Sequence, residues 1–249
     1  MSLFGKRYMA AKGLAQWTAS VCLICAASVL HAAPTDGVIF WSDTDKNPDL
    51  TLSADQLTVS LTGFQWEEKA VRGNRPINPG EGFYYFEVTN TLSSLFGVGV
   101  ATDAVPLNEL GGFSPNMATI NQEARMVYNG SFSSHLANPA DTVGVAVDYR
   151  GAHPIIHFIA AEEGSAAQHV GMVEMDSVSS PIYFFLSVAD HVGAGLEHSL
   201  NLGGAAFVYD PAPVIDSGLF NGSVGLTMGW PIDNASPEVT IAEGDVVSL

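Results

Sequence analysis

Two alternating stretches constrain the fold of this 249-residue chain more than any other feature. FGVGVA at 96–101 and TVGVAVD at 142–148 place valine at every second position, with glycine or alanine between. Successive side chains of a β-strand point to opposite faces, so each stretch has one branched face and one nearly bare face. A bare face indicates that another segment approaches closely. The pattern therefore predicts sheets covered on both sides, by a second sheet or by long loops.

Further short apolar runs, bounded by Gly, Pro, Asn and Asp, continue this pattern along the chain. Amphipathic segments long enough for parallel βαβ units do not occur, and only NEL (108–110) and NMATINQEARMVY (116–128) could hold a helical turn or two. We therefore predict an all-β, antiparallel β-sandwich with very little helix. The runs expected as strands are 38–41, 57–61, 82–89, 96–101, 142–148, 154–159, 182–188 and 198–202.

The first 32 residues resemble a secretory signal peptide. Lys6, Arg7 and Lys12 precede an uncharged apolar run that ends at HAAP, which places a cleavage site after Ala32. We expect a secreted or periplasmic protein, in a bacterium, without membrane insertion once the leader is removed. An uncleaved membrane anchor is the alternative, because the apolar run approaches spanning length.

Charge and cysteine content exclude several classes of function. The formal net charge is −17, and loss of the leader, which contains three basic and no acidic residues, would bring it to −20. Such a chain repels nucleic acid, since phosphate binding needs clustered lysine and arginine. Both cysteines, Cys22 and Cys25, lie in the leader. The remainder therefore cannot use disulfides, thiol catalysis or thiolate metal sites.

Five segments, in order along the chain, resemble the strand motifs of the SPRY family. A sixth, FWSDTDKNPDLTLSADQLTVSL (40–61), is similar to the PRY segment that precedes many SPRY domains, with Leu50, Leu52 and Leu57 expected in the core. The five are VRGNRPINPGEGFYYFEVT (71–89), FGVGVATDAVPLNELGG (96–112), ADTVGVAVDY (140–149), PIYFFLSV (181–188) and LNLGGAAFVYDP (200–211).

The resemblance implies a concanavalin-like jelly roll over residues 34–211, followed by an extension over 212–249. It also implies binding of a peptide or protein partner through loops gathered at one edge. The candidate loops are 72–80, 103–117 and 189–197, and the candidate binding residues are Arg72, Asn74, Arg75, Pro76, Leu107, Phe113 and His191. Arg72 and Arg75 could anchor a partner's carboxylate, or they could pair with acids of the chain itself.

Residues 43–49 offer a weak alternative, a calcium site. Asp43, Asp45, Asn47 and Asp49 stand at every second position, as calcium loops space their oxygens. Pro48 and Ala54, however, occupy the positions where an EF-hand loop has Gly and Glu. Short Asp and Asn side chains also bond to nearby backbone in turns. We favour turns that join the first two strands, and expect no cofactor or metal.

Catalytic patterns are scarce. His153 and His157 would lie about 13 Å apart on a strand, too far to share a metal, so they are expected as polar positions facing outward or toward a loop. His191 and His198 are expected in a loop and hairpin, as solvated side chains. The sequence contains no GxSxG elbow, and in a strand the adjacent pairs Glu67–Glu68 and Glu162–Glu163 point to opposite faces.

These observations favour a non-enzymatic recognition module for a peptide or protein partner. The rivals are a carbohydrate-binding module, with Trp66 or Trp230 as its aromatic platform, and a structural envelope or adhesion protein.

Overall fold

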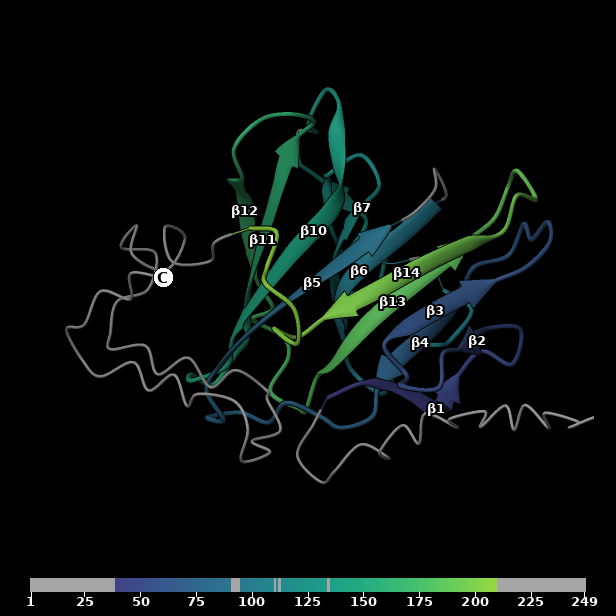
Figure 1. Ribbon diagram of the computed structural model, residues 1–249. Helices are drawn as coiled ribbons and strands as arrows, with labels where there is room; N and C mark the ends of the chain where they lie inside the picture. The colour runs from purple at the N-terminus through teal and green to yellow at the C-terminus, as the bar shows by residue number, and fades with distance from the viewer. Residues whose placement is uncertain (1–38, 91–94, 110, 112, 134, 210–249) are drawn as a thin grey trace, which may run out of the picture. The chain divides into compact units, whose positions relative to one another are not determined.

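The computed structural model describes residues 39–90, 95–109, 111, 113–133 and 135–209, and all regular elements among them are β-strands. They form two antiparallel seven-stranded sheets (Figure 1). None of the described segments forms a helix with the length and hydropathy needed to cross a bilayer.

In spatial order, the first sheet contains β1 (Trp41–Lys46), β4 (Lys69–Gly73), β13 (Tyr183–Ala189), β6 (Leu95–Ala101), β7 (Met117–Asn121), β8 (Met126–Tyr128) and β9 (Ser131–Phe132). The second contains β12 (Gln168–Glu174), β11 (Ile155–Glu162), β10 (Pro139–Asp148), β5 (Phe83–Asn90), β14 (Leu196–Asn201), β3 (Thr58–Leu61) and β2 (Thr51–Leu52).

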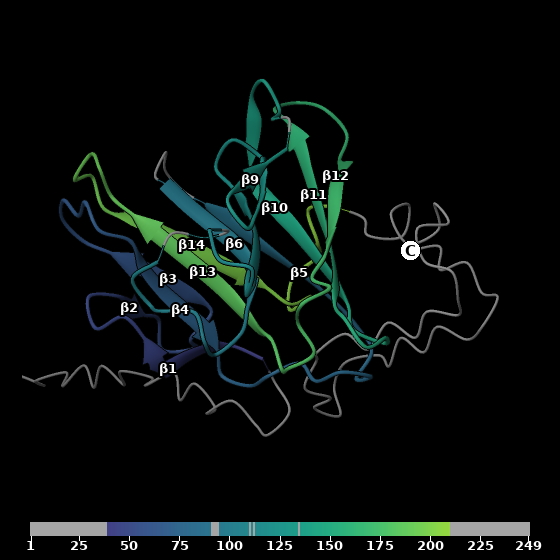
Figure 2. The same cartoon turned by 180° about the vertical axis from the view of Figure 1, so that it is seen from behind.

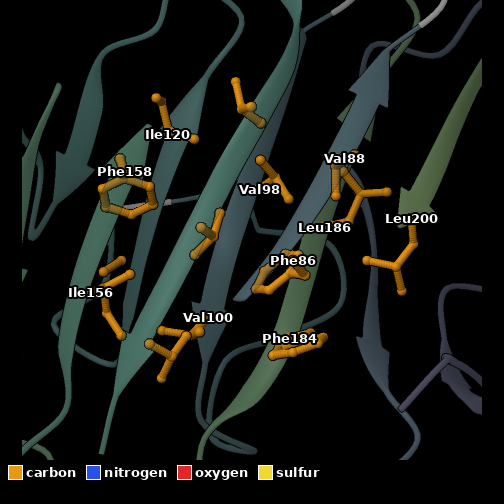
Figure 3. Close-up of a cluster of buried hydrophobic side chains, with 14 of the residues drawn as sticks. Phe86, Val88, Val98, Val100, Ile120, Ile156, Phe158, Phe184, Leu186 and Leu200 are labelled. Carbon is orange, nitrogen blue, oxygen red and sulfur yellow. The ribbon is translucent and has the colours of Figure 1, made fainter. Parts of the chain in front are cut away.

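The main hydrophobic core lies between the two sheets, where their facing side chains interdigitate (Figure 3). Phe86 of β5 stacks on Phe184 of β13 with ring centroids 4.0 Å apart. Val98 and Val100 of β6 point into the same core, as the alternating pattern predicts. Leu50 is buried there, and Leu52 and Leu57 are partly buried against it.

The outer face of the first sheet is covered by the connection between β6 and β7. Gly111 of this connection approaches so closely that a Cβ added to Gly97 would meet its Cα at 3.0 Å. The Gly111 N–H donates to Ser187 Oγ of β13 at 3.0 Å. The bare face of 96–101 is therefore covered by a loop, one of the two predicted arrangements.

The outer face of the second sheet is covered by residues 203–209, which buried Glu87 of β5 fixes in place. Its carboxylate accepts hydrogen bonds from the backbone N–H groups of Val208 and Tyr209, both at 2.7 Å, and from Tyr85 Oη at 2.9 Å. The Tyr209 hydroxyl donates to Thr142 O at 2.5 Å. The bare position Gly144 accommodates the ring of Tyr85.

The predicted sandwich is confirmed, and seven of the eight expected strands form within the described residues. The expected strand at 38–41 is wrong, because residues 39 and 40 lie outside any strand and β1 begins only at Trp41. The helical alternative for 116–128 is wrong, because this stretch forms the β7–β8 hairpin. In its turn, Asn121 Oδ1 accepts hydrogen bonds from the backbone N–H groups of Glu123 and Arg125. Ala124 adopts a left-handed conformation there, with a φ of 50°. The predicted leader (1–32) and extension (212–249) lie outside the described residues.

Gly99→Ala is expected to destabilise the fold by about 2 kcal/mol, as overpacking of a tight site does. The new Cβ would overlap Ala118 O of the neighbouring strand and approach Thr119 Cα at 2.9 Å. Gly204→Ala is the matched control, since its Cβ would meet nothing within 4 Å. Urea unfolding of both variants measures the difference, and equal stability would contradict the close packing.

Candidate recognition surface

Two loops lie side by side at one end of the sandwich, the end at which β3 and β13 stop (Figure 1, Figure 2). Residues 62–68 connect β3 to β4, and residues 190–195 connect β13 to β14. Strand register places them together, because Leu61 pairs with Leu196 and Lys69 pairs with Val188. We call this end, with the β7–β8 turn and the start of β10, the loop end.

Three rings pack together on these two loops, the exposed Phe64 and Trp66 and the half-buried His191. We call them the aromatic platform. Trp66 is 68% exposed and Phe64 is 50% exposed. The Phe64 ring meets Trp66 edge-on at 5.1 Å, and His191 packs against Trp66 at 4.7 Å with a tilt of 43°. A soluble chain rarely leaves its largest apolar side chain this open without a binding role.

The platform rests on loops that hydrogen bonds hold in place. The Asp190 carboxylate accepts bonds from the backbone N–H groups of Val192, Gly193 and Gly195 at 3.0, 2.7 and 2.8 Å. Desolvation raises the pKa of Asp190, but these backbone donors outweigh it and lower that pKa overall. Gln65 N donates to Asp190 O at 2.9 Å, which ties the two loops together.

A cavity of about 400 Å³ opens beside the platform, between the two sheets. His191 and Val192 belong to its lining, and Val192 is 73% exposed. Phe96 and Val143 supply apolar wall, while Asn121, Gln122 and Asp141 supply polar groups. Apolar walls with a few polar groups are typical of ligand and peptide sites.

His198 of β14 lies beside this cavity and is completely buried. Its ring contacts Phe96 at 5.5 Å, and neither ring nitrogen has a hydrogen-bond partner within the described part of the chain. Burial disfavours the charged imidazolium and lowers the pKa of His198 to about 4. The sequence interpretation of His198 as a solvated hairpin residue is therefore wrong.

The three loops proposed from the sequence do not gather at one edge. Residues 189–197 lie at the loop end, whereas 72–80 lie at the opposite end, where Ile77 bridges to Ile182. Residues 103–117 cross the outer face of the first sheet, and Leu107 packs there on a cluster around Ala70. Of the residues proposed for binding, only His191 reaches the platform.

Arg72 and Arg75 pair with acids of the chain itself, which was one of the two alternatives. The Arg72 side chain is 3% exposed; it donates to Asp45 Oδ1 at 2.9 Å, Thr102 O at 3.1 Å and Val105 O. Arg75 lies 3.5 Å from Glu81. Arg72 therefore fastens the start of the β6–β7 connection rather than facing a partner.

The remaining proposed residues are scattered. Phe40 N donates a hydrogen bond to Asn74 Oδ1, and Asn74 N donates one to Phe40 O. Pro76 is half-buried next to Ile77. Phe113 is exposed and packs against Phe132 at 5.7 Å. This second aromatic pair lies on the β8–β9 side of the first sheet, with β13, β6 and β7 between it and β4.

Residues 47–50 form the predicted turn between the first two strands, whereas residues 43–46 belong to β1. Asn47 Oδ1 accepts a bond from Asp49 N, and Asn47 O accepts one from Leu50 N. The carboxylates of Asp43, Asp45 and Asp49 face Lys46, Arg72 and Lys69 respectively. Within the described residues, no three His, Cys, Asp or Glu side chains gather as a metal site would require.

His157 was expected to face outward or toward a loop, but it is buried. Its Nδ1 lies 3.2 Å from Nε2 of His169 on β12, and burial, followed by the field of His169, lowers its pKa to about 4. His153 instead places Nδ1 2.9 Å from Val178 O.

Phe64, Val192 and the cavity were missed by the sequence analysis, and Trp66 was considered only as a sugar platform. Two aromatics in the short polar segment TGFQWEE, between predicted strands, were the available signal. Their nearness to 190–195 follows only from strand register.

The structure is similar to the crystal structure of a TRIM65 PSpry domain, with a TM-score of 0.52 and 13% sequence identity over 66% of this chain and 92% of that chain. Stonustoxin is also similar, with a TM-score of 0.48, 13% identity, and 66% and 27% of the two chains covered. No protein-family model and no curated protein matches the sequence. The first likeness shows an SPRY-like fold, in agreement with the sequence resemblance.

Acidification is expected to destabilise the chain through His198. Its pKa is about 4 when folded and about 6.5 when unfolded. Between these values the unfolded chain binds more protons, so the free energy of unfolding falls as the pH drops from about 6.5 to about 4. His198→Leu should lose less stability than the parent between pH 7 and pH 4.5 in urea unfolding. Equal losses would contradict a buried neutral imidazole.

Proposed function

We propose that this chain is a secreted or periplasmic, non-enzymatic recognition module that binds a peptide or protein partner at its loop end. The observation that carries the proposal is Trp66, exposed and packed against His191, which lines an open cavity. Loops held by a rigid sandwich are suited to recognition. The SPRY-like fold adds support, because the family that the sequence resembles generally binds protein partners through such loops.

The make-up of the surface favours protein over small-molecule chemistry. Aromatic residues dominate the energetic centres of protein interfaces, and a ring of less important contacts excludes water around them. Trp66 and Phe64 supply such a centre, while Val192 and the cavity offer a place for one side chain of the partner. The Asp190 carboxylate is engaged by backbone N–H groups, which supports a structural role for it.

A carbohydrate is the second candidate ligand, favoured by one specific observation. The open indole of Trp66 also has the form of a platform on which a sugar ring could stack. A glycan array probed with the full chain distinguishes the two kinds of ligand. Saturable glycan binding that is lost in Trp66→Ala would show that the ligand is a sugar and not a protein.

Capture of a partner from extracellular protein extract tests the proposal. Trp66→Ala should weaken capture by about 30-fold, the loss expected for an interface hot spot of 2 kcal/mol. Phe113→Ala is the matched control, because it removes another exposed aromatic from the separate pair with Phe132. Equal capture by the parent and both variants would contradict a recognition role for the platform. Binding of neither protein nor glycan would leave the structural envelope role ahead.

A further inference from the structure

We infer that the partner presents a basic segment, and that one arginine or lysine side chain of it stacks on Trp66. This inference rests on the proposed function and adds the chemical class of the partner. It depends on the open face of one aromatic ring, on the carboxylates next to it, and on the pairing of the chain's own cations.

The geometry of the platform leaves room for a stacked cation. Phe64 meets Trp66 at an interplanar angle of 86°, so it contacts the indole edge-on. His191 packs against the same ring at 4.7 Å, yet 68% of Trp66 stays exposed. The electron-rich face of tryptophan is the side-chain surface that attracts lysine and, more often, arginine.

Carboxylates border the platform. Glu67 and Glu68 directly follow Trp66. The Glu67 side chain is 81% exposed, although its Oε2 also lies 3.3 Å from Lys69 Nζ. Across the cavity, Asp141 is exposed and lines the same opening as His191. Carboxylates accept the planar set of N–H donors that a guanidinium presents, so acids next to an aromatic face favour arginine there.

The chain's own cations are already paired. Each lysine and arginine within the described ranges has an acidic partner: Lys46 with Asp43, Lys69 with Asp49 and Glu67, Arg72 with Asp45, Arg75 with Glu81, Arg125 with Glu123, and Arg150 with Asp148. Lys69, the cation nearest in sequence to Trp66, is buried, and its bond to Asp49 is the largest cause of its raised pKa. Within the described residues, none of these cations is placed to cover the platform, which agrees with a cation that the partner supplies.

Charge complementarity selects among possible occupants. With a formal net charge of −17, the chain repels an acidic segment and attracts a basic one from a distance. A second copy of the chain would bring the same negative charge. A neutral sugar could stack on Trp66 but would gain nothing from Glu67, Glu68 or Asp141.

Selection from a random peptide library displayed on phage tests this inference. The full chain is the bait, and binders of the Trp66→Ala chain are first removed. We expect the remaining peptides to be enriched in arginine or lysine.

The affinity of the most enriched peptide is then measured with variants of the chain. Trp66→Ala should weaken binding at least tenfold and Glu67→Gln/Glu68→Gln several-fold, whereas Trp66→Phe should keep most of the affinity. Glu174→Gln/Asp176→Asn is the charge-matched control. Both acids are exposed, and they lie at the end of β12 that is farther from the loop end.

The outcomes separate this inference from the function on which it rests. Peptides that depend on Trp66 but lack basic enrichment would overturn the basic partner and leave peptide recognition in place. Basic peptides weakened equally by both double variants would show attraction to net charge alone and would also overturn it. If no peptide depends on Trp66 in a variant that keeps the parent's melting temperature, peptide recognition at the platform fails as well.

Discussion

Burial of both sheets on both faces is the constraint on which the rest of the structure depends. The inner faces meet through large side chains, as in the Phe86–Phe184 stack. The outer faces are bare enough for chain to lie directly on them, with Gly111 against Gly97 and residues 203–209 held by Glu87. A segment that covers a sheet face is itself fixed in place. The long β6–β7 connection is therefore largely part of the scaffold, and Arg72 fastens its start.

The same constraint leaves one end of the sandwich for recognition. Strand register brings the 62–68 and 190–195 loops together there, and Asp190 organises the second of them through backbone bonds. Neither loop folds back over a sheet face, so Phe64 and Trp66 remain open. A surface that is already rigid loses little conformational freedom on binding, which favours affinity.

Much of the fold could be predicted from the sequence, because period-two alternation reports directly on which side chains face inward. The same rule could have placed His198 inside, between Leu196 and Leu200, had the HSLNL run been extended by two residues. The β7–β8 hairpin was harder, since its turn depends on one asparagine side chain and on a left-handed alanine. The platform could not be predicted, because which loops share an end depends on long-range pairing rather than on local composition.

Hydrogen exchange of the full chain, with and without a captured partner, shows whether the partner covers the aromatic platform. Backbone amides sample local opening, and bound partners slow exchange where they cover the chain. We expect slower exchange at 62–68 and 190–195 when the partner is bound, with exchange at 72–80 unchanged. Protection confined to 72–80, or to the Phe113–Phe132 pair, would contradict it.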